Sequence, residues 1–238
     1  GLEFHLGSQV IGAKALKTTV TVTVKDQKGK TDEITCDRLL VSVGRRPYSQ
    51  GLDLEKAGVK TDKSGFVVVD EKFATSVPGI YAIGDLIPGP MLAHKAEEEG
   101  VAVAELLSGK PGHVNYRAIP NIVYTWPELA HLGMTEEEAK EKGMKIKVGK
   151  YYFKSNGRAK CMDSTDGLVK ILSDADSDRL LGVHILGPYA SELIAELVMA
   201  FEFQASAEDV ARTIHAHPTL SEVVKEAALA VDKRSIHG

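Results

Sequence analysis

Hydrophobic and polar residues alternate through residues 8–43, and this alternation predicts β-strands. Valine occupies every second position across residues 20–24, as expected of a strand with one covered face. A short apolar run at residues 39–43 ends at Gly44, which is typical of a strand buried on both faces. The start of the chain is therefore expected to form a small sheet and one buried strand.

A long helix is predicted in the next part of the chain. Residues 91–107 are mostly strong helix formers, they follow a Pro-Gly-Pro turn, and a glycine and a proline shortly afterwards would end the helix. Two short strands are predicted before it, at residues 66–69 and 80–83. The second of these strands leads directly into Gly84 and Asp85.

The pattern changes beyond a boundary near residues 114–120. A run of strands followed by a run of helices is typical of an α+β domain with a mainly antiparallel sheet. Extended segments are predicted at residues 122–126, 129–132, 146–153, 158–162, 168–172 and 180–186, and helices at 135–142, 189–204, 207–212 and 220–231.

Composition then narrows the classes of partner. The 238-residue chain has 29 Lys and Arg against 33 Asp and Glu, a net charge of −4, which gives no electrostatic footprint for DNA or RNA. No apolar run approaches the roughly 20 residues of a membrane-spanning helix. The two cysteines, Cys36 and Cys161, cannot form a disulfide framework and suggest a reducing compartment. We expect neither nucleic acid nor a membrane among the partners.

The segment at residues 215–222 contains the most informative chemistry. His217 precedes a proline and a predicted helix, and Glu222 follows five residues later on the first turn. A carboxylate that accepts a hydrogen bond from one imidazole nitrogen raises the basicity of the other, so the pair suits general acid/base catalysis near neutral pH. A structural interpretation is equally open here, because Thr219 and Glu222 have the spacing of a capping box.

Asp85 is a second candidate, because it follows a predicted strand at its carboxyl end, where nucleotides bind in α/β sheets. Its carboxylate could accept a hydrogen bond from a ribose or ribityl hydroxyl, or it could simply begin the next turn. His94 lies at the start of the long helix, where backbone N–H groups suit a phosphate or an electron-rich ring edge. His94 could equally be an ordinary polar residue of the first turn.

Signatures of a self-contained active site are absent from the sequence. It has no G-x-G-x-x-G, Walker, C-x-x-C or G-x-S-x-G motif, and its histidines show no paired spacing for a metal ion. Gly44 stands beside two arginines that could contact a nucleotide or pair with carboxylates. The individual motifs therefore leave the function open.

Read together, four strings resemble the dihydrolipoamide dehydrogenases, a family of flavin disulfide reductases. The resemblance covers essentially the whole chain in the family's order, but only the carboxyl-terminal half of such an enzyme. It implies the end of an NAD-binding domain at residues 1–46, the later part of the FAD-binding region at 47–117 and an interface (dimerisation) domain at 118–238. The strings are residues 80–85, 89–97, 182–188 and 215–222.

The resemblance implies roles for particular residues. His217 would exchange a proton with the substrate thiol, and Glu222 would orient the imidazole of His217. The disulfide and the flavin on which they act would belong to the other subunit of a homodimer. Asp85 would contact the ribityl chain of FAD. The remaining expected contacts are Met91, Leu92, Ala93 and His94 with the flavin, through their backbone, and Gly44 and Val10 with NAD.

The resemblance also implies an activity, partners and a location. The reaction would be the oxidation of protein-bound dihydrolipoamide, with electrons passing through a disulfide and FAD to NAD, and the partners would be the lipoyl domains of the 2-oxo acid dehydrogenase complexes. We expect the mitochondrial matrix, or the cytoplasm if the protein is bacterial. Glutathione and mercuric reductases compete within the superfamily, but the Met-Leu-Ala-His string and the missing carboxyl-terminal cysteine pair argue against them.

Features of the family's amino-terminal half do not occur here, namely the glycine-rich FAD loop, the C-x-x-x-x-C pair and the NAD fingerprint. We therefore expect a fragment that is inactive alone. A different class of function is a non-catalytic dimerisation or complex-docking module. It is favoured by apolar residues on more than one face of the helix predicted at residues 189–204.

Overall fold

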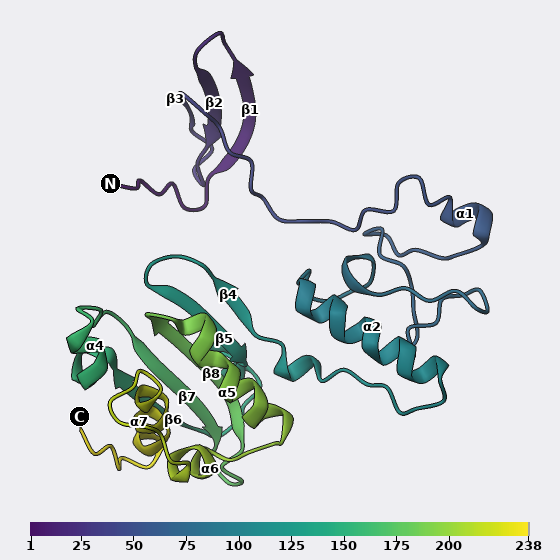
Figure 1. Ribbon diagram of the computed structural model, residues 1–238. Helices are drawn as coiled ribbons and strands as arrows, with labels where there is room; N and C mark the ends of the chain where they lie inside the picture. The colour runs from purple at the N-terminus through teal and green to yellow at the C-terminus, as the bar shows by residue number, and fades with distance from the viewer. Residues whose placement is uncertain (238) are drawn as a thin grey trace. The chain divides into compact units, whose positions relative to one another are not determined.

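The computed structural model describes residues 1–237 and contains two compact units, which divide at Arg46 and Pro47 (Figure 1). The first unit is a three-stranded antiparallel sheet in the order β1-β2-β3. Its central strand contains Val22, the one buried residue of residues 1–46. The strands are β1 (Gln9–Ala15), β2 (Val20–Lys25) and β3 (Thr31–Cys36).

The turn between β2 and β3 is closed by Asp26. Its Oδ1 accepts the backbone N–H groups of Lys28 and Lys30 at 2.9 and 2.8 Å. An aspartate that bonds to backbone groups further along the chain stabilises a tight reversal without help from tertiary contacts. This turn is therefore a local property of the sequence.

The buried strand expected at residues 39–43 is absent, and that prediction is wrong. These residues have no strand pairing, and Leu40, Val41 and Val43 are 86%, 71% and 91% exposed. An apolar run becomes a strand only where neighbouring strands satisfy its backbone groups and cover its side chains. The sheet of the first unit ends at β3, so this run has no neighbour within it.

The second unit is built on a five-stranded sheet in the order β4-β5-β8-β7-β6, with every pair antiparallel. The expectation of an α+β fold with a mainly antiparallel sheet is thus confirmed. The strands are β4 (Asn121–Val123), β5 (Glu128–Gly133), β6 (Ile146–Tyr152), β7 (Leu168–Asp174) and β8 (Leu180–Gly187).

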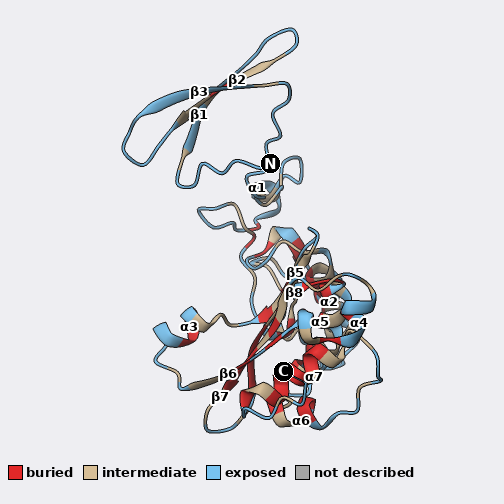
Figure 2. Cartoon of the chain, turned by 90° about the vertical axis from the view of Figure 1, so that its left-hand side faces the viewer, coloured by how far each residue is buried: buried red, intermediate tan, exposed pale blue. Residues whose placement is uncertain are grey.

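Helices cover the apolar face of this sheet. Val183 and Ile185 of β8 are fully buried, whereas His184 between them lies on the other face and is half-buried, as the two-residue period of a strand requires. Helix α5 contacts β5 and β8, and α7 contacts β6 and β7. Figure 2 shows the buried residues concentrated in this sheet and its helices. The helices are α5 (Ala190–Glu202), α6 (Ala207–Arg212) and α7 (Glu222–Val231).

A smaller core around Val67, Phe73 and Ala102 supports the rest of the second unit. The strands expected at residues 66–69 and 80–83 are only isolated bridges, because their N–H groups bond to loops instead of to a neighbouring strand. The remaining helices are α1 (Leu54–Ala57), α2 (Ala93–Leu107), α3 (Glu136–Glu141) and α4 (Gly157–Cys161), with 3-10 turns η1 (Gly84–Leu86), η2 (Tyr116–Ala118) and η3 (Phe153–Ser155).

Helix α4 replaces the extended segment that was expected at residues 158–162. Asn156 caps it, because its side chain accepts the N–H of Ala159 at 2.9 Å. Asparagine is a preferred N-cap residue, and Arg, Ala and Lys then favour helix over strand. A segment of five residues is too short for its pattern to distinguish helix from strand, and the Asn156 cap is the feature that indicates a helix.

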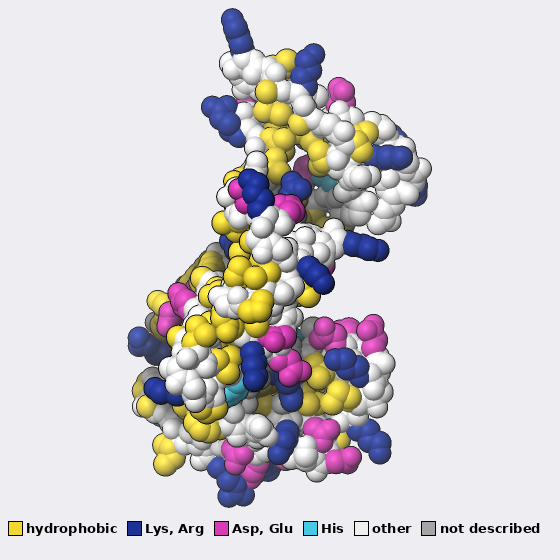
Figure 3. Space-filling view, turned by 90° about the vertical axis from the view of Figure 1, so that its right-hand side faces the viewer, with side chains coloured by type: hydrophobic (Ala, Val, Ile, Leu, Met, Phe, Trp, Pro, Cys, Tyr) yellow, Lys and Arg dark blue, Asp and Glu magenta, His cyan; other side chains and the backbone are white. Residues whose placement is uncertain are grey.

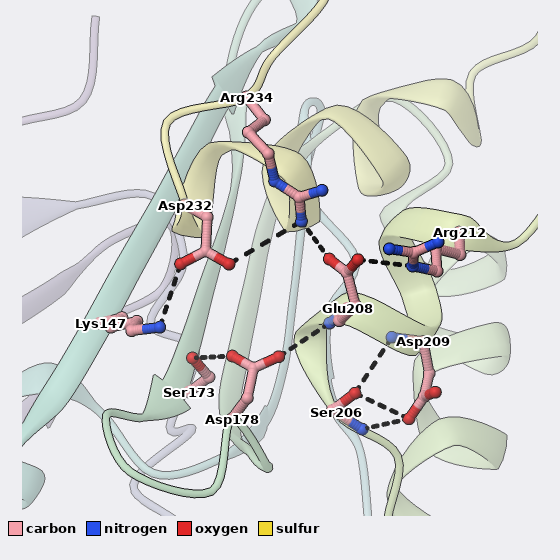
Figure 4. A network of polar contacts seen from close by, with 9 residues as sticks. All are labelled: Lys147, Ser173, Asp178, Ser206, Glu208, Asp209, Arg212, Asp232 and Arg234. Atoms are coloured by element: carbon pink, nitrogen blue, oxygen red, sulfur yellow. Dashed lines mark hydrogen bonds and ion pairs between the residues drawn. The ribbon is translucent and has the colours of Figure 1, made fainter.

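A polar network joins α6 and the end of α7 to the sheet (Figure 4). Glu208 of α6 forms ion pairs with Arg234 and Arg212, and Lys147 of β6 bonds to Asp232 at 3.0 Å. Exposed pairs of this kind contribute little to stability, because water and salt screen them. The network therefore fixes the direction of the helix ends more than it stabilises the fold.

Large apolar side chains also reach the surface, and Figure 3 shows hydrophobic side chains exposed among charged ones. Helix α5 and its flanks expose Tyr189, Met199 and Phe203 to 47%, 60% and 80%. None of the helices formed by residues 1–237 has the length and apolar character needed to cross a membrane.

The contact between β6 and α7 gives a first prediction. A Cβ on Gly149 would collide with the carbonyl oxygen of Ala227 and would lie 2.6 Å from the backbone nitrogen of Val231. Gly149→Ala should therefore force α7 away from the sheet and lower the free energy of unfolding by about 1–3 kcal/mol in a urea titration.

Gly157→Ala is the matched control. A Cβ on Gly157 meets no atom within 4 Å, so this substitution at the start of α4 should change the free energy of unfolding by less than about 0.5 kcal/mol. Equal effects of the two substitutions would show that α7 does not depend on its close approach to β6.

Candidate functional site

His217 and Glu222 form a hydrogen-bonded pair at the start of α7. Nδ1 of His217 lies 2.9 Å from Oε1 of Glu222, and the two side chains are 73% and 17% exposed. Nε2 makes no hydrogen bond within residues 1–237, so it is accessible to a group from outside this chain. A carboxylate on Nδ1 places the proton of the neutral imidazole there and leaves Nε2 as the acceptor.

Glu222 also fixes the loop that carries this histidine. Its Oε2 accepts the backbone N–H of Thr219 at 2.8 Å. Partial burial by itself would raise the pKa of Glu222, but the bonds from Thr219 and His217 outweigh it, so the pKa lies below its usual range. Glu222 is therefore the charged partner at neutral pH.

The capping box expected at Thr219 and Glu222 is only half formed. The Thr219 hydroxyl donates to the carbonyl of Ala216 at 2.7 Å instead of capping the helix, and α7 begins after Ser221 without a side-chain cap. The loop before the helix folds back so that the Thr219 hydroxyl meets the carbonyl of Ala216, and the hydroxyl is therefore not free to accept an N–H of the helix. Glu222 thus holds the loop, and the structural and catalytic interpretations of it coexist.

Asn156 supports the same loop and was missed at the level of sequence. It is 4% exposed, and its Nδ2 donates to the carbonyl of Thr219 at 2.9 Å while its Oδ1 caps α4. The sequence signal for the cap was the Ser-Asn-Gly string at residues 155–157. Its contact with residue 219 depends on chain folding, since 63 positions separate the two residues.

A second histidine–carboxylate pair lies beside the first. The side chain of His215 is 5% exposed, its Nδ1 lies 3.0 Å from the carbonyl oxygen of Thr213, and its Nε2 lies 3.4 Å from Oε1 of Glu196 on α5. The bond to Glu196 raises the pKa of His215, although burial opposes it. This pair ties the His217 loop to α5.

The expected flavin contacts gather at η1 and the start of α2. Asp85 is exposed, and its carboxylate makes no hydrogen bond within residues 1–237. Leu92 is the N-cap of α2 and provides no side-chain cap, so the first N–H groups of the helix are left to an external acceptor. His94 is half-buried and its Nε2 lies 3.0 Å from the carbonyl oxygen of Pro120.

These residues fit a ligand with hydroxyl groups and an electron-rich ring edge. The half-buried Met91 and Leu92 and the exposed Ala93 follow the turn directly. No hydrogen bond or ion pair joins His217 or Glu222 to Asp85 or His94 within the described part of the chain. The two groups of candidates are thus separate features of the second unit.

The expected NAD contacts lie in the first unit. Val10 is 60% exposed on β1, and Gly44 has a φ of +99° with open space around it. Neither residue offers a side-chain donor or acceptor, so only backbone groups could contact a nucleotide. Both assignments therefore stay predictions.

The two cysteines, Cys36 and Cys161, are free thiols.

The raised pKa of His215 gives a prediction of pH dependence. A histidine whose pKa is higher in the folded state stabilises the fold fully below the unfolded pKa of 6.5, and this stabilisation disappears as the pH rises through the folded pKa. Glu196→Gln should therefore lower the free energy of unfolding more at about pH 5.5 than at about pH 8.5.

Glu192→Gln, an exposed change on the same helix, is the control for this titration. Its effect on the free energy of unfolding should be the same at both pH values, because Glu192 has no histidine partner in the described residues. A pH-independent effect of Glu196→Gln would contradict the role assigned to the pair.

The chain is similar to known proteins along nearly its whole length. Dihydrolipoyl dehydrogenase 1, mitochondrial, of Arabidopsis thaliana is 52% identical over 237 residues, which are 99% of this chain and 47% of that protein. Dihydrolipoyl dehydrogenase of Cupriavidus necator is 50% identical over 237 residues, covering 100% of this chain and 50% of that protein. The chain thus spans about half the length of these curated relatives.

Solved structures and family models lead to the same group. The HOCl-induced flavoprotein disulfide reductase RclA from Escherichia coli matches with a TM-score of 0.81 and 27% identity, over 92% of this chain and 50% of that one. Residues 1–100 match the family model for pyridine nucleotide-disulphide oxidoreductases, and residues 119–228 match the dimerisation domain of the same enzymes. The chain therefore belongs to the pyridine nucleotide-disulphide oxidoreductases.

Proposed function

We propose that this chain provides the acid/base histidine and the dimer interface of a dihydrolipoyl dehydrogenase. In that reaction a protein-bound dihydrolipoamide loses two electrons and two protons to become lipoamide, a protein disulfide is reduced, and NAD finally receives the electrons as hydride. The observation that carries the proposal is the His217–Glu222 pair, whose outer nitrogen is exposed.

His217 would act on the substrate thiol through Nε2. Accepting the thiol proton creates the thiolate, which is the nucleophile that attacks a disulfide sulfur. Glu222 stays ionised because its pKa is lowered, so it stabilises the imidazolium that forms. Cys36 and Cys161 are free and do not form the C-x-x-x-x-C pair of the family, so the disulfide would come from residues outside this chain.

The residues around η1 would hold part of FAD. Asp85 would accept a hydrogen bond from a ribityl hydroxyl, and Met91, Leu92, Ala93 and His94, at and just before the start of α2, would contact the ring edge through backbone groups. When bound, FAD conducts the electron pair from the disulfide to NAD. We propose Val10 and Gly44 as NAD contacts, with no step assigned to either residue.

The interface domain at residues 118–238 would form the homodimer. Its match to a dimerisation domain, the exposed Met199 of α5 and the exposed Phe203 directly after the helix support this assignment. We further propose the domain limits 1–46 and 47–117 for the NAD and FAD parts. The partners would be the lipoyl domains of 2-oxo acid dehydrogenase complexes in the mitochondrial matrix, a location supported by mitochondrial relatives although a bacterial relative matches as well.

A non-catalytic dimerisation module is the second candidate, and the apolar surface of α5 favours it. In this case the exposed imidazole would be incidental, and the chain would associate without a need for flavin. Another disulfide reductase of the same family, such as a glutathione or mercuric reductase, is a further alternative, which would differ from a dihydrolipoyl dehydrogenase in its substrate.

Replacing the histidine tests the proposed function in the complete holoenzyme. His217→Gln should lower kcat for dihydrolipoamide by about 10²–10⁴-fold, because no other group accepts the thiol proton. FAD content and the unfolding midpoint should be unchanged, since the side chain is 73% exposed. Glu222→Gln should lower kcat less, because an amide oxygen can still accept the Nδ1–H bond.

His113→Gln is the matched control, since this histidine is 78% exposed and its carboxylate neighbour, Glu202, lies 3.9 Å away. Its kcat should equal that of the wild type. A His217 variant with full activity would exclude the acid/base assignment, and a parallel loss of activity and stability would make His217 a structural residue.

A further inference from the structure

A buried ion pair lies directly behind the turn that carries Asp85. Lys95 and Glu99 of α2 are one helical turn apart, their side chains are 1% and 0% exposed, and Nζ lies 3.0 Å from Oε1. Removing both charges from water is costly, so such a pair persists only where further hydrogen bonds satisfy each charge. The identity of those further partners therefore indicates what the pair does.

Both further bonds go to the backbone of Gly84. Nζ of Lys95 donates to the Gly84 carbonyl at 3.0 Å, and the Gly84 N–H donates to Oε2 of Glu99 at 2.6 Å. The peptide groups on both sides of this glycine are thus held by one ion pair. Apolar side chains of the same volume could fill the space, but they could not bind these two groups.

The close approach of the turn to α2 depends on the same contacts. Gly84 has a φ of +68°, and a Cβ there would lie 3.0 Å from the Cβ of Ala96. Further along the loop, a Cβ on Gly89 would lie 2.9 Å from Cε of Lys95. Residues 84–89 therefore wrap around the stem of Lys95, with Asp85 as the exposed residue next to the pinned peptide.

Tyr116 adds a third bond to the carboxylate. Its hydroxyl donates to Oε1 of Glu99 at 2.7 Å from η2. Burial raises the pKa of Tyr116, and the adjacent Glu99 raises it further, so the hydroxyl keeps its proton and remains a donor. Residues 116–118 are thus linked to the same Lys95–Glu99 pair, which we call the clamp.

We infer that Lys95 and Glu99 are positioning residues that fix the Gly84–Asp85 turn against α2 and so hold the Asp85 carboxylate where a flavin hydroxyl meets it. The inference rests on the proposed function, because it takes Asp85 as a contact of FAD. Neither Lys95 nor Glu99 reaches the ligand side of the turn, since both side chains are buried behind it.

The decisive experiment replaces the ion pair with apolar residues in the FAD-loaded holoenzyme. Lys95→Met combined with Glu99→Leu removes the buried charges together, so the unfolding midpoint should fall less than in either single variant, which would leave one charge buried without its partner. FAD should bind about tenfold more weakly, as measured by the flavin fluorescence that appears on release, because the turn is no longer fixed. Hydrogen exchange at the Gly84 amide should be faster.

Tyr116→Phe serves as a variant that is safe for folding, because Tyr116 is 49% exposed and loses only its hydroxyl. It should weaken FAD binding a few-fold, whereas Glu97→Gln, an exposed change on the same helix, should have no effect. If the double variant does not fold, this comparison decides the question.

Unchanged FAD affinity and unchanged Gly84 exchange in the folded variants would overturn the inference and leave the proposed function intact. A complete wild-type enzyme that binds no FAD would instead overturn the proposed function, and the positioning role with it. The exchange rate of the Gly84 amide separates the two outcomes, because it reports on the clamp without any flavin chemistry.

Discussion

One carboxylate on the first turn of α7 determines the geometry of the candidate catalytic histidine. Glu222 binds the imidazole of His217 with one oxygen and the backbone of Thr219 with the other. Because α7 packs against β6 and β7, the position of the exposed imidazole is set by the core of the second unit. The orientation of this surface side chain is thereby set by a hydrogen bond from the helix behind it.

The chain uses ionisable pairs in two contrasting ways. His217 and Glu222 lie at the surface, where the imidazole can exchange a proton with a partner. Lys95 and Glu99 are sealed from solvent, and their hydrogen bonds go to backbone groups. Exposure suits a pair to proton transfer, and burial suits a pair to geometry, because a buried partner is held by the charge and the backbone groups that it must compensate.

Part of the candidate site could be predicted from the sequence. The spacing of His217 and Glu222 around a proline indicated a pair, and the helix formers after residue 91 indicated α2, which begins at Ala93. The roles of Glu196 and Asn156 could not be predicted, because both residues are distant in sequence from the loop that they support. The burial of Lys95 and Glu99 could not be predicted, since nothing local shows that a loop folds over them.

The sequence by itself determined the class of fold, the course of the long helix and the close pairing of His217 with Glu222, because periodicity and short spacings act within a few residues. Tertiary structure decided the rest. The apolar run at residues 39–43 stays exposed for want of a neighbouring strand, and the charged Lys95 becomes buried because Gly84 closes over it. Burial depends on which segments meet, and that is a property of the folded chain as a whole.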